Sequence, residues 1–306
     1  MKILITGSAG RVGRAIYINL MQQHAVFGLD TTPCSTVDMV ADIRDTPKII
    51  HALRGVDVII HSAALHAPHV GLATEQDFIQ TNIDATERLA LEGIKQNIKH
   101  FVFTSTTALY GFASTPQGQA GWVNEHTQPQ PKTIYHTSKI EAENKLKRLS
   151  QLFNLPITVL RMSRCFPEPA NVMSVYRLTR GIDVRDVAHA HACAISARLK
   201  GFRTYIISGH TPFDRDDCIA LYHNAGDMLQ KKAPDLAKAF AQRHWPLPNT
   251  LDRVYDSSLA QKELQWQPKY GYHSVINMLD CELPEVLPPV NLISTIRRTY
   301  NKKNNH

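Results

Sequence analysis

Tyr135 and Lys139 are four residues apart in a segment, 135–152, whose pattern predicts a helix. On a helix this spacing is one turn, about 6 Å along the axis, and it places both side chains on one face. A free tyrosine has a pKa near about 10 and is a poor base at neutral pH, but a nearby ammonium favours the phenolate. We therefore expect Lys139 to lower the pKa of Tyr135, which could then exchange a proton with a substrate hydroxyl.

Hydroxyl-bearing residues lie upstream of this pair. Thr104, Ser105, Thr106 and Thr107 stand at the end of an apolar run that predicts a strand over 100–105. The carboxyl ends of strands in an open parallel sheet border the ligand crevice, so one of these hydroxyls can hold a substrate oxygen beside Tyr135. The tyrosine–lysine spacing alone is common on solvated helix faces. The hydroxyl residues upstream make it a more specific sign of a catalytic pair.

A glycine-rich loop follows the first predicted strand. Gly7, Gly10 and Gly13 are spaced G-x-x-G-x-x-G and lead into a helical pattern. Such a loop supplies a tight turn, a close backbone approach to a pyrophosphate, and helix N–H groups that face the anion. We therefore expect a bound dinucleotide, whose positively charged nicotinamide would act together with Lys139 to lower the pKa of Tyr135.

The carboxylate of Asp30 distinguishes between dinucleotides. It ends a predicted strand, where it can accept hydrogen bonds from both adenosine ribose hydroxyls and would repel a 2′-phosphate. We expect NAD rather than NADP, although Arg11 and Arg14 could reach a 2′-phosphate. Asp42 and Ile43 could bracket the adenine, with Asp42 accepting from the amino group; a turn aspartate is the alternative.

Strands and helices that could hold these groups alternate along the chain. The pattern predicts strands over 2–6, 25–30, 37–41, 56–61, 100–105, 157–160 and 204–208, and helices over 11–23, 47–54, 74–97, 135–152 and 183–199. Nearly continuous apolar strands are typical of parallel sheets covered on both faces. We predict an α/β fold with a Rossmann-type doubly wound parallel sheet and a small C-terminal substrate lobe.

The pattern changes after residue 161 to short helices and many prolines. We expect a Rossmann domain of residues 1–162 plus 182–210, and a substrate lobe of residues 163–181 plus 211–306. Trp266 and Pro268 are expected in the core of that lobe. A chain of 306 residues can bury its core without disulfides, and its five cysteines are too widely spaced to suggest any.

Together the motifs resemble the extended short-chain dehydrogenase/reductase family, a group of NAD-dependent sugar epimerases, dehydratases and dehydrogenases. The resemblance covers most of the chain and starts from the glycine loop, Asp30 and the Tyr135/Lys139 pair. Further matches are Asp42-Ile43, the turn 61–64, Asn82, Leu160-Arg161, the segment 183–187 and the segment 264–268.

The resemblance implies a role for each matching residue. Counted back from Tyr110-Gly111, the catalytic hydroxyl is Thr106, with Ser105 as second choice, and it acts with Tyr135 and Lys139. The residues expected to bind the cofactor are Gly7, Ala9, Gly10, Arg11, Val12, Gly13, Asp30, Asp42, Ile43, Ser62, Ala63, Ala64, Asn82, Thr104, Ser105, Tyr135 and Lys139. Those expected to contact the substrate are His66, Thr106, Thr107 and Arg164.

Two departures from the family pattern narrow the reaction. The dehydratases carry an Asp-Glu pair directly after the catalytic threonine, whereas Thr107 and Ala108 cannot titrate. Only 21 residues separate Arg161 from Asp183, where members acting on sugar nucleotides have dozens more. Dehydration is therefore disfavoured, and we expect a substrate smaller than a sugar nucleotide.

The loop 165–169 resembles that of uronate dehydrogenases, which oxidise free sugar acids. Met173 stands where their substrate-binding arginine is expected, with Arg177 nearby. Arg164 and Arg185 could bind a substrate anion, although a surface salt bridge is the alternative for both.

We expect an NAD-dependent oxidoreductase acting on a hydroxyl or carbonyl carbon of a sugar or sugar acid. An epimerase of sugars or sugar nucleotides that retains NAD between turnovers is the first alternative. A non-catalytic NAD-binding sensor is the second, and the intact Thr106, Tyr135 and Lys139 argue against it, because a sensor needs no proton relay.

Three histidines, His61, His66 and His69, fall within nine residues, but no nearby carboxylate or cysteine completes a zinc site, so we expect no metal. His61 ends a buried strand and is expected to pack there, whereas His66 is expected near the substrate.

Charge and hydropathy bear on partners. The net charge of +7 is partly local, because four cations crowd a tail that we expect to be frayed: Arg297, Arg298, Lys302 and Lys303. With no nucleic-acid motif and no apolar run near about 20 residues, we expect neither nucleic acid nor membrane as partner, and a cytoplasmic location. The resemblance implies a homodimer that pairs the helices at 74–97 and 135–152.

Overall fold

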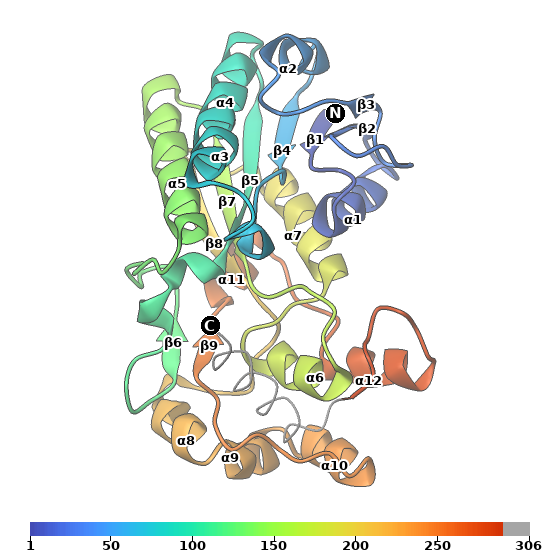
Figure 1. Ribbon diagram of the computed structural model, residues 1–306, viewed down its shortest axis with the longest axis vertical. Coiled ribbons are helices and arrows are strands. Elements are labelled where there is room, and N and C mark those ends of the chain that lie inside the picture. Colours follow the sequence, from blue (N-terminus) through green and yellow to red (C-terminus); the bar gives the residue numbers. More distant parts are fainter. Residues whose placement is uncertain (290–306) are drawn as a thin grey trace.

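The computed structural model describes residues 1–289, and its centre is a seven-stranded sheet (Figure 1). The strands are β1 (Lys2–Thr6), β2 (Ala25–Asp30), β3 (Met39–Val40), β4 (Val58–His61), β5 (His100–Thr106), β7 (Ile157–Met162) and β8 (Phe202–Ile207). All are parallel, in the order β3-β2-β1-β4-β5-β7-β8. The order reverses between β1 and β4, so the carboxyl ends of these two strands border the ligand crevice.

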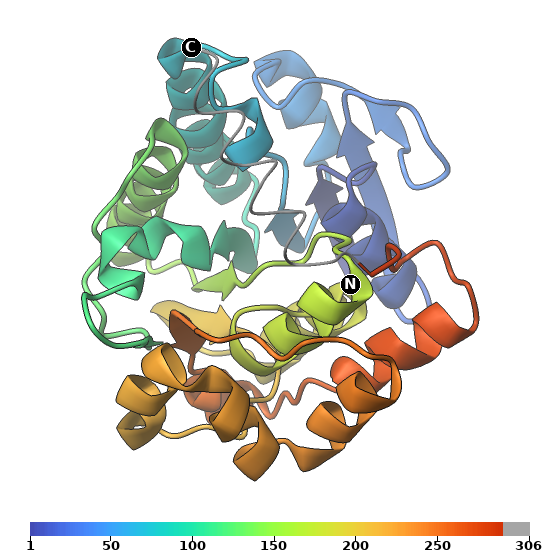
Figure 2. The same cartoon turned by 60° about the horizontal axis from the view of Figure 1, so that its bottom comes forward.

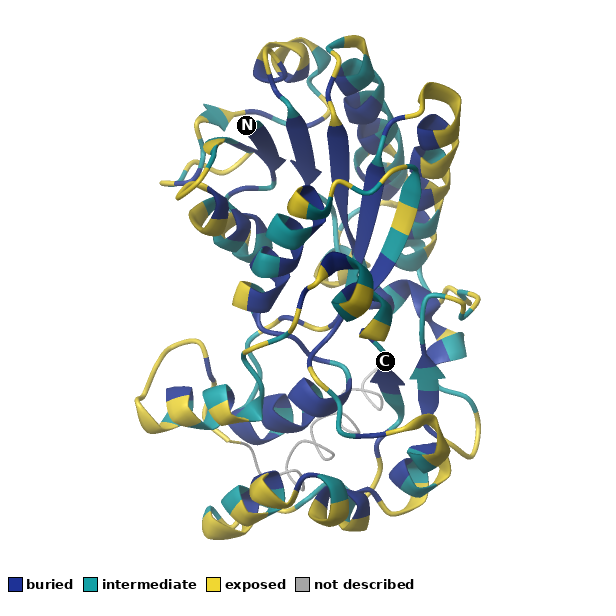
Figure 3. Cartoon of the chain, turned by 180° about the vertical axis from the view of Figure 1, so that it is seen from behind, coloured by how far each residue is buried: buried dark blue, intermediate teal, exposed yellow. Residues whose placement is uncertain are grey.

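Two layers of helices cover the sheet, because its strands are apolar on both faces. One face packs against α1 (Arg11–Leu20), α7 (Val184–Ala197) and α11 (Ser258–Leu264). The other packs against α2 (Thr46–Ala52), α4 (Ala85–Lys95) and α5 (Ile134–Phe153). The central strands are buried along most of their length (Figure 3).

A smaller lobe lies at the carboxyl end of the strands (Figures 1 and 2). Its helices are α6 (Ala170–Thr179), α8 (Cys218–His223), α9 (Ala225–Lys232), α10 (Pro234–Gln242) and α12 (Tyr272–Asp280). Two short parallel strands, β6 (Gly121–Val123) and β9 (Arg253–Tyr255), form its sheet. The lobe has an apolar core of its own, in which Leu221, Leu229, Leu236 and Phe240 are almost fully buried.

The predicted fold class is confirmed, with differences at the ends of elements. The helix expected over 74–97 is wrong as a single α-helix: α3 (Glu75–Phe78) is followed by a π-helical segment (Ile79–Asp84) and then by α4. A π-segment is a local widening of a helix that is frequent at functional sites. Here it contains Asn82, whose buried side chain bonds to two other segments, as described below.

Trp266 packs on the Rossmann sheet, so its expected place in the lobe core is wrong. The indole is fully buried among residues of α7, β8 and α11, and its Nε1 donates to the Asp186 carbonyl at 3.1 Å. The chain therefore returns from the lobe to the larger domain after β9. The four cations expected in a frayed tail lie outside the described residues.

We predict that Trp266→Ala lowers the free energy of unfolding by about 3–5 kcal/mol, because it leaves a large cavity in the core. Urea unfolding followed by circular dichroism measures the change. Phe153→Ala, at a side chain that is about half exposed, is the control and should change stability by less than about 0.5 kcal/mol. A loss below about 1 kcal/mol for Trp266→Ala would contradict the packing described.

Candidate active site

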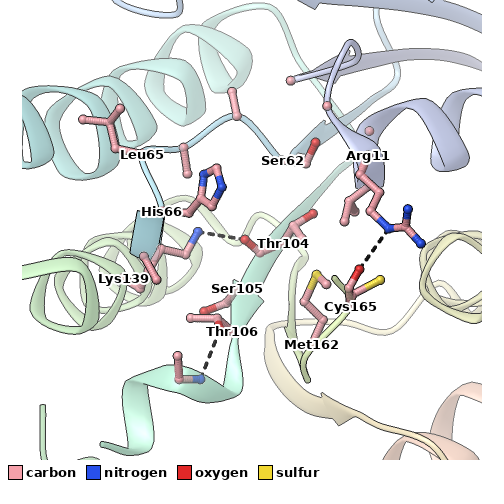
Figure 4. A pocket seen from close by; sticks show the side chains of 18 of the residues that line it. Arg11, Ser62, Leu65, His66, Thr104, Ser105, Thr106, Lys139, Met162 and Cys165 are labelled. Carbon is pink, nitrogen blue, oxygen red and sulfur yellow. Dashed lines mark hydrogen bonds between the residues drawn. The ribbon is translucent and has the colours of Figure 1, made fainter. Parts of the chain in front are cut away.

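A cavity of about 730 Å³ runs along the carboxyl edge of the sheet, from the glycine loop to the lobe. Its wall comes from the loops after β1, β2, β4, β5 and β7, from α5 and α6, and from β9. The predicted site residues on this wall are Gly7, Gly10, Arg11, Val12, Gly13, Asp30, Asp42, Ile43, Ser62, Ala63, Ala64, His66, Thr104, Ser105, Thr106, Thr107, Tyr135, Lys139 and Arg164. Figure 4 shows part of this wall.

The glycine loop has the backbone shape that a pyrophosphate requires. Gly7 has a φ of +74°, and a Cβ at Gly13 would lie 2.0 Å from the Gly7 carbonyl oxygen. Helix α1 starts at Gly10 without a side-chain cap, so its first N–H groups remain available to an anion. The loop therefore fits the phosphates of a dinucleotide.

Asp30 shapes the same loop from the end of β2. One carboxylate oxygen accepts from the Ala9 N–H and the other from the Thr32 N–H, both at 3.0 Å. Each oxygen keeps lone-pair capacity for a ribose hydroxyl. Ala9 is not among the described residues of the wall, and its expected contact with the cofactor stays a prediction.

Asn82 was expected to bind the cofactor, and the described cavity wall does not include it. Its Oδ1 accepts from the Leu65 N–H at 2.8 Å, and its Nδ2 donates to the Leu65 carbonyl at 2.8 Å and to the Ser138 Oγ at 3.0 Å. The amide thus holds the loop after β4 against α5. Its role is to position that loop, whose residues do line the cavity.

Asp42 lies in a turn and carries an ion pair. Its carboxylate accepts from the Arg44 Nη2 at 2.7 Å and from the Arg44 N–H at 2.8 Å, and the Asp45 N–H donates to its carbonyl at 3.0 Å. The turn alternative is therefore what the structure shows, although Asp42 also lies on the cavity wall. Arg44 holds the pKa of this carboxyl below its usual range.

The Tyr135 and Lys139 side chains are one turn apart on α5 and both face the end of β5. Thr106 is the neighbour of Tyr135 that favours its phenolate form. The Lys139 Nζ donates to the Thr104 carbonyl at 2.8 Å and lies 3.9 Å from the centre of the Phe103 ring (Figure 4). The three predicted catalytic residues are therefore neighbours on one wall.

Ser105, the second choice for the catalytic hydroxyl, has another partner. Its Oγ donates to the Glu143 carboxylate at 2.5 Å, and Glu143 also accepts from the Arg161 Nη2 at 2.6 Å. The Arg161 Nη1 donates to the Tyr110 hydroxyl at 2.9 Å. The geometry therefore favours Thr106 over Ser105 as the hydroxyl beside Tyr135.

Glu143 was missed by the sequence analysis. It follows Lys139 by four residues, as Lys139 follows Tyr135, so the same helical spacing could have found it. The carboxylate is buried, and its charge opposes the lowering of the Lys139 pKa.

The expected lowering of the Tyr135 pKa is wrong for the polypeptide on its own. Burial raises the pKa of Tyr135 to about 12, and the hydrogen bond with Thr106 offsets only part of this rise. Burial also lowers the pKa of Lys139 to about 7, so much of the amine is neutral near neutral pH. Desolvation disfavours the charged form of both groups. Its effect on each pKa is larger than the effect that the two groups have on one another.

The remaining predicted residues have ordinary partners. His61 is fully buried between the hydroxyls of Thr6 at 2.6 Å and Thr86 at 2.8 Å, which confirms its packing role. His66 lies on the cavity wall and stacks on Phe166 with ring centres 6.0 Å apart. The salt-bridge alternative holds for both arginines in question, since Arg164 pairs with Glu168, and Arg185 pairs with Asp183 at 2.9 Å.

Four side chains of the lobe complete the cavity wall and were not predicted: Tyr176, Arg180, Arg253 and Tyr255. They come from α6 and β9, more than 40 residues from any predicted motif of the cofactor loop, and carry no local pattern that marks a site. Within residues 1–289 no group of three or more His, Cys, Asp or Glu side chains could hold a metal ion. None of the described helices is both long and apolar enough to cross a bilayer.

We predict that Lys139→Met changes how stability depends on pH. The pKa of Lys139 is about 7 in the folded chain against 10.5 for a free lysine, so the unfolded chain binds an extra proton between these values. This makes the wild-type free energy of unfolding fall as pH drops from about 10 towards 7, by about 1 kcal/mol per pH unit relative to the variant. Urea titrations at several pH values measure this difference. Lys147→Met, on the exposed face of α5, is the control, and parallel curves for wild type and Lys139→Met would contradict the prediction.

Comparisons with known proteins agree with this geometry. The model of the NAD dependent epimerase/dehydratase family matches residues 3–174. An uncharacterized UDP-glucose epimerase, YtcB, of Bacillus subtilis is 29% identical over 201 residues, which are 59% of this chain and 62% of that protein. An NAD-dependent glucose-6-phosphate dehydrogenase of Haloferax volcanii is 24% identical over 213 residues, 64% of this chain and 80% of that protein.

Solved structures show the same fold. A short-chain dehydrogenase/reductase superfamily protein from Agrobacterium tumefaciens, with NAD bound, superposes with a TM-score of 0.70 at 18% identity over the full length of both chains. The expectation of NAD is confirmed at the level of the family. Because the family model covers more than half of its residues, this chain belongs to the NAD dependent epimerase/dehydratase family.

Proposed function

We propose that this protein is an NAD-dependent oxidoreductase that interconverts a hydroxyl and a carbonyl on a small sugar-like substrate. The observation that supports this best is the placement of Thr106 beside Tyr135, with Lys139 one turn further along α5, on the wall of the cavity that starts at the glycine loop. A buried phenol beside a second hydroxyl is suited to proton exchange with a substrate oxygen.

Each residue of this group has a distinct part in the proposal. The glycine loop and Asp30 would hold NAD, which when bound exchanges a hydride with the substrate carbon. Thr106 orients the substrate oxygen, and Tyr135 donates or accepts its proton. Lys139, held on the Thr104 carbonyl, brings a titratable amine to the same pocket.

The raised pKa of Tyr135 predicts how the rates of reduction and oxidation depend on pH. With a pKa of about 12, the phenol is protonated near neutral pH and is ready to donate a proton to a carbonyl. Oxidation of a hydroxyl instead needs the phenolate, so its rate should increase with pH. A positive charge brought by a bound nicotinamide would favour the phenolate.

The shape of the lobe supports a small substrate. The described lobe residues on the cavity wall are the segment 163–166 and the side chains Tyr176, Arg180, Arg253 and Tyr255. The 21 residues between Arg161 and Asp183 form one helix, α6, with short connections. The absence of titratable side chains at positions 107 and 108 argues against elimination of water.

An epimerase that retains NAD is the second candidate, and the similarity to YtcB favours it. It would purify with bound NAD and convert its substrate without net formation of NADH. A homodimer and a cytoplasmic location remain predictions; size-exclusion chromatography with light scattering tests the former.

We predict that the protein produces NADH from NAD and at least one sugar or sugar acid, and that Tyr135→Phe lowers kcat at least about 100-fold. The absorbance of NADH measures both rates. Tyr222→Phe, a tyrosine of α8 outside the cavity wall, is the matched control and should retain the wild-type rate. Binding of NAD by each variant, followed by fluorescence, shows that it is folded.

Two results would contradict this function. Full activity of Tyr135→Phe would exclude Tyr135 from the proton relay, whereas binding of NAD without any turnover would favour the sensor. Turnover of a sugar nucleotide without net NADH, by a protein that purifies with NAD, would establish the epimerase instead.

A further inference from the structure

Two arginines of the lobe, Arg180 and Arg253, share one carboxylate at the substrate end of the cavity. We propose that this pair is a binding site for an anionic group of the substrate, a carboxylate or a phosphate monoester on a sugar. This inference rests on the proposed function and names the substrate class of the same site.

Arg253 is held in place by two partners. Its Nε and Nη2 donate to the two oxygens of Asp252 at 3.0 and 2.7 Å, and its Nη1 donates to the Ser114 Oγ at 3.1 Å. The guanidinium is therefore fixed at the end of β9 before any ligand binds. A fixed planar donor recognises carboxylate and phosphate oxygens with little loss of side-chain entropy.

Arg180 approaches the same carboxylate from the end of α6. Its Nη1 donates to the Asp252 oxygens at 3.2 and 3.3 Å, and its Nη2 donates to the Tyr176 hydroxyl at 2.7 Å. The guanidinium also lies over the Tyr176 ring, 4.3 Å from its centre. Its Nε–H has no acceptor among the described residues, so the group keeps donor capacity for a ligand.

The charges of this cluster do not balance. Two guanidinium groups face one carboxylate, which leaves one net positive charge. Arg180 and Arg253 lie on the cavity wall, whereas Asp252 is not among the described wall residues. A ligand in the cavity therefore meets the cations and not the carboxylate behind them.

Carboxylates are found only at the other end of the described cavity wall. The acidic residues of that wall are Asp30 and Asp42, which follow β2 and β3 in the dinucleotide half. Arg164, the substrate arginine expected from the sequence, pairs with Glu168. The substrate end is thus positive, and its uncompensated charge comes from the two lobe arginines, which share one carboxylate.

The position of the pair suits a substrate held against Thr106. The Tyr255 hydroxyl, two residues after Arg253, donates to the Thr107 carbonyl at 3.4 Å. This bond connects β9 directly to the residue after Thr106. One small molecule could therefore contact both the arginines and the proton-transfer group.

The two residues nearest to the arginine position of uronate dehydrogenases do not serve this purpose here. Met173 is buried in an apolar cluster of α6 and α12, and Arg177 is buried in an ion pair with Asp183 at 3.1 Å. Neither is among the described residues of the cavity wall. If this chain recognises an anion, Arg180 and Arg253 are the residues placed to do so.

The first experiment uses the wild-type protein with NAD and pairs of probes that differ in charge. Glucuronate and glucose 6-phosphate are compared with glucose, and galacturonate with galactose, by kcat/KM from NADH formation. We expect at least one anionic probe to exceed its neutral partner by about 10- to 100-fold, the range of a charged hydrogen bond. The better of the two anions identifies a carboxylate or a phosphate as the group bound.

The second experiment compares variants that change the charge in opposite directions. We expect Arg253→Gln to lower the preference for the anionic probe about tenfold or more. Asp252→Asn removes the competing carboxylate and should keep or raise this preference. Arg243→Gln, which removes an arginine paired with Asp280 on α12, is the control and should leave the preference unchanged.

The outcomes separate this inference from the proposed function. Equal kcat/KM for charged and neutral probes, or an equal loss of preference in Arg253→Gln and Asp252→Asn, would overturn the anion site. If no probe yields NADH, calorimetric titration of glucuronate and glucose 6-phosphate into the protein with NAD decides. Binding that is tighter than for glucose and lost in Arg253→Gln would keep the anion site and overturn the reaction, whereas no such binding would overturn both.

Discussion

The buried hydrogen bond from the Lys139 Nζ to the Thr104 carbonyl connects the two elements on which the rest of the site depends. It joins α5, which carries Tyr135, to the end of β5, which carries Thr106. A lysine is rarely buried this completely, and here its amine has a carbonyl acceptor, an aromatic ring and a nearby carboxylate, Glu143. The lowered pKa of the amine is the energetic consequence of holding it there.

The two ends of the cavity differ in charge, and each end suits a different ligand. Its dinucleotide end has carboxylates, of which Asp30 is suited to ribose hydroxyls, together with a helix N-terminus suited to phosphates. Its substrate end has arginines that share a single carboxylate. In the proposed function, proton transfer would take place between these ends, at a phenol whose burial keeps it protonated.

The sequence predicted those features that follow from local spacing. Apolar runs identified the seven strands of the main sheet, and the i, i+4 spacing identified Tyr135 and Lys139. The pairing of β6 with β9 joins residues 121–123 to 253–255, and strands of three residues carry no pattern of their own. For the same reason Arg253 could not be placed at the cavity. In the polypeptide alone the pKa of Tyr135 is raised, because desolvation depends on burial, which spacing does not reveal.

The end of β5 explains why the chain keeps a buried ion pair, Glu143 with Arg161, that does not face the substrate. The Thr104 carbonyl holds Lys139, the Ser105 hydroxyl bonds to Glu143, and the Thr106 side chain lies beside Tyr135. Because Glu143 is itself fixed by Arg161, the middle residue is anchored independently of its two neighbours. Burying such a pair contributes little net stability, so its value lies in the position it imposes. An anchored Ser105 keeps Thr106 within reach of Tyr135 whether or not a ligand is bound, which is the preorganisation that proton transfer requires.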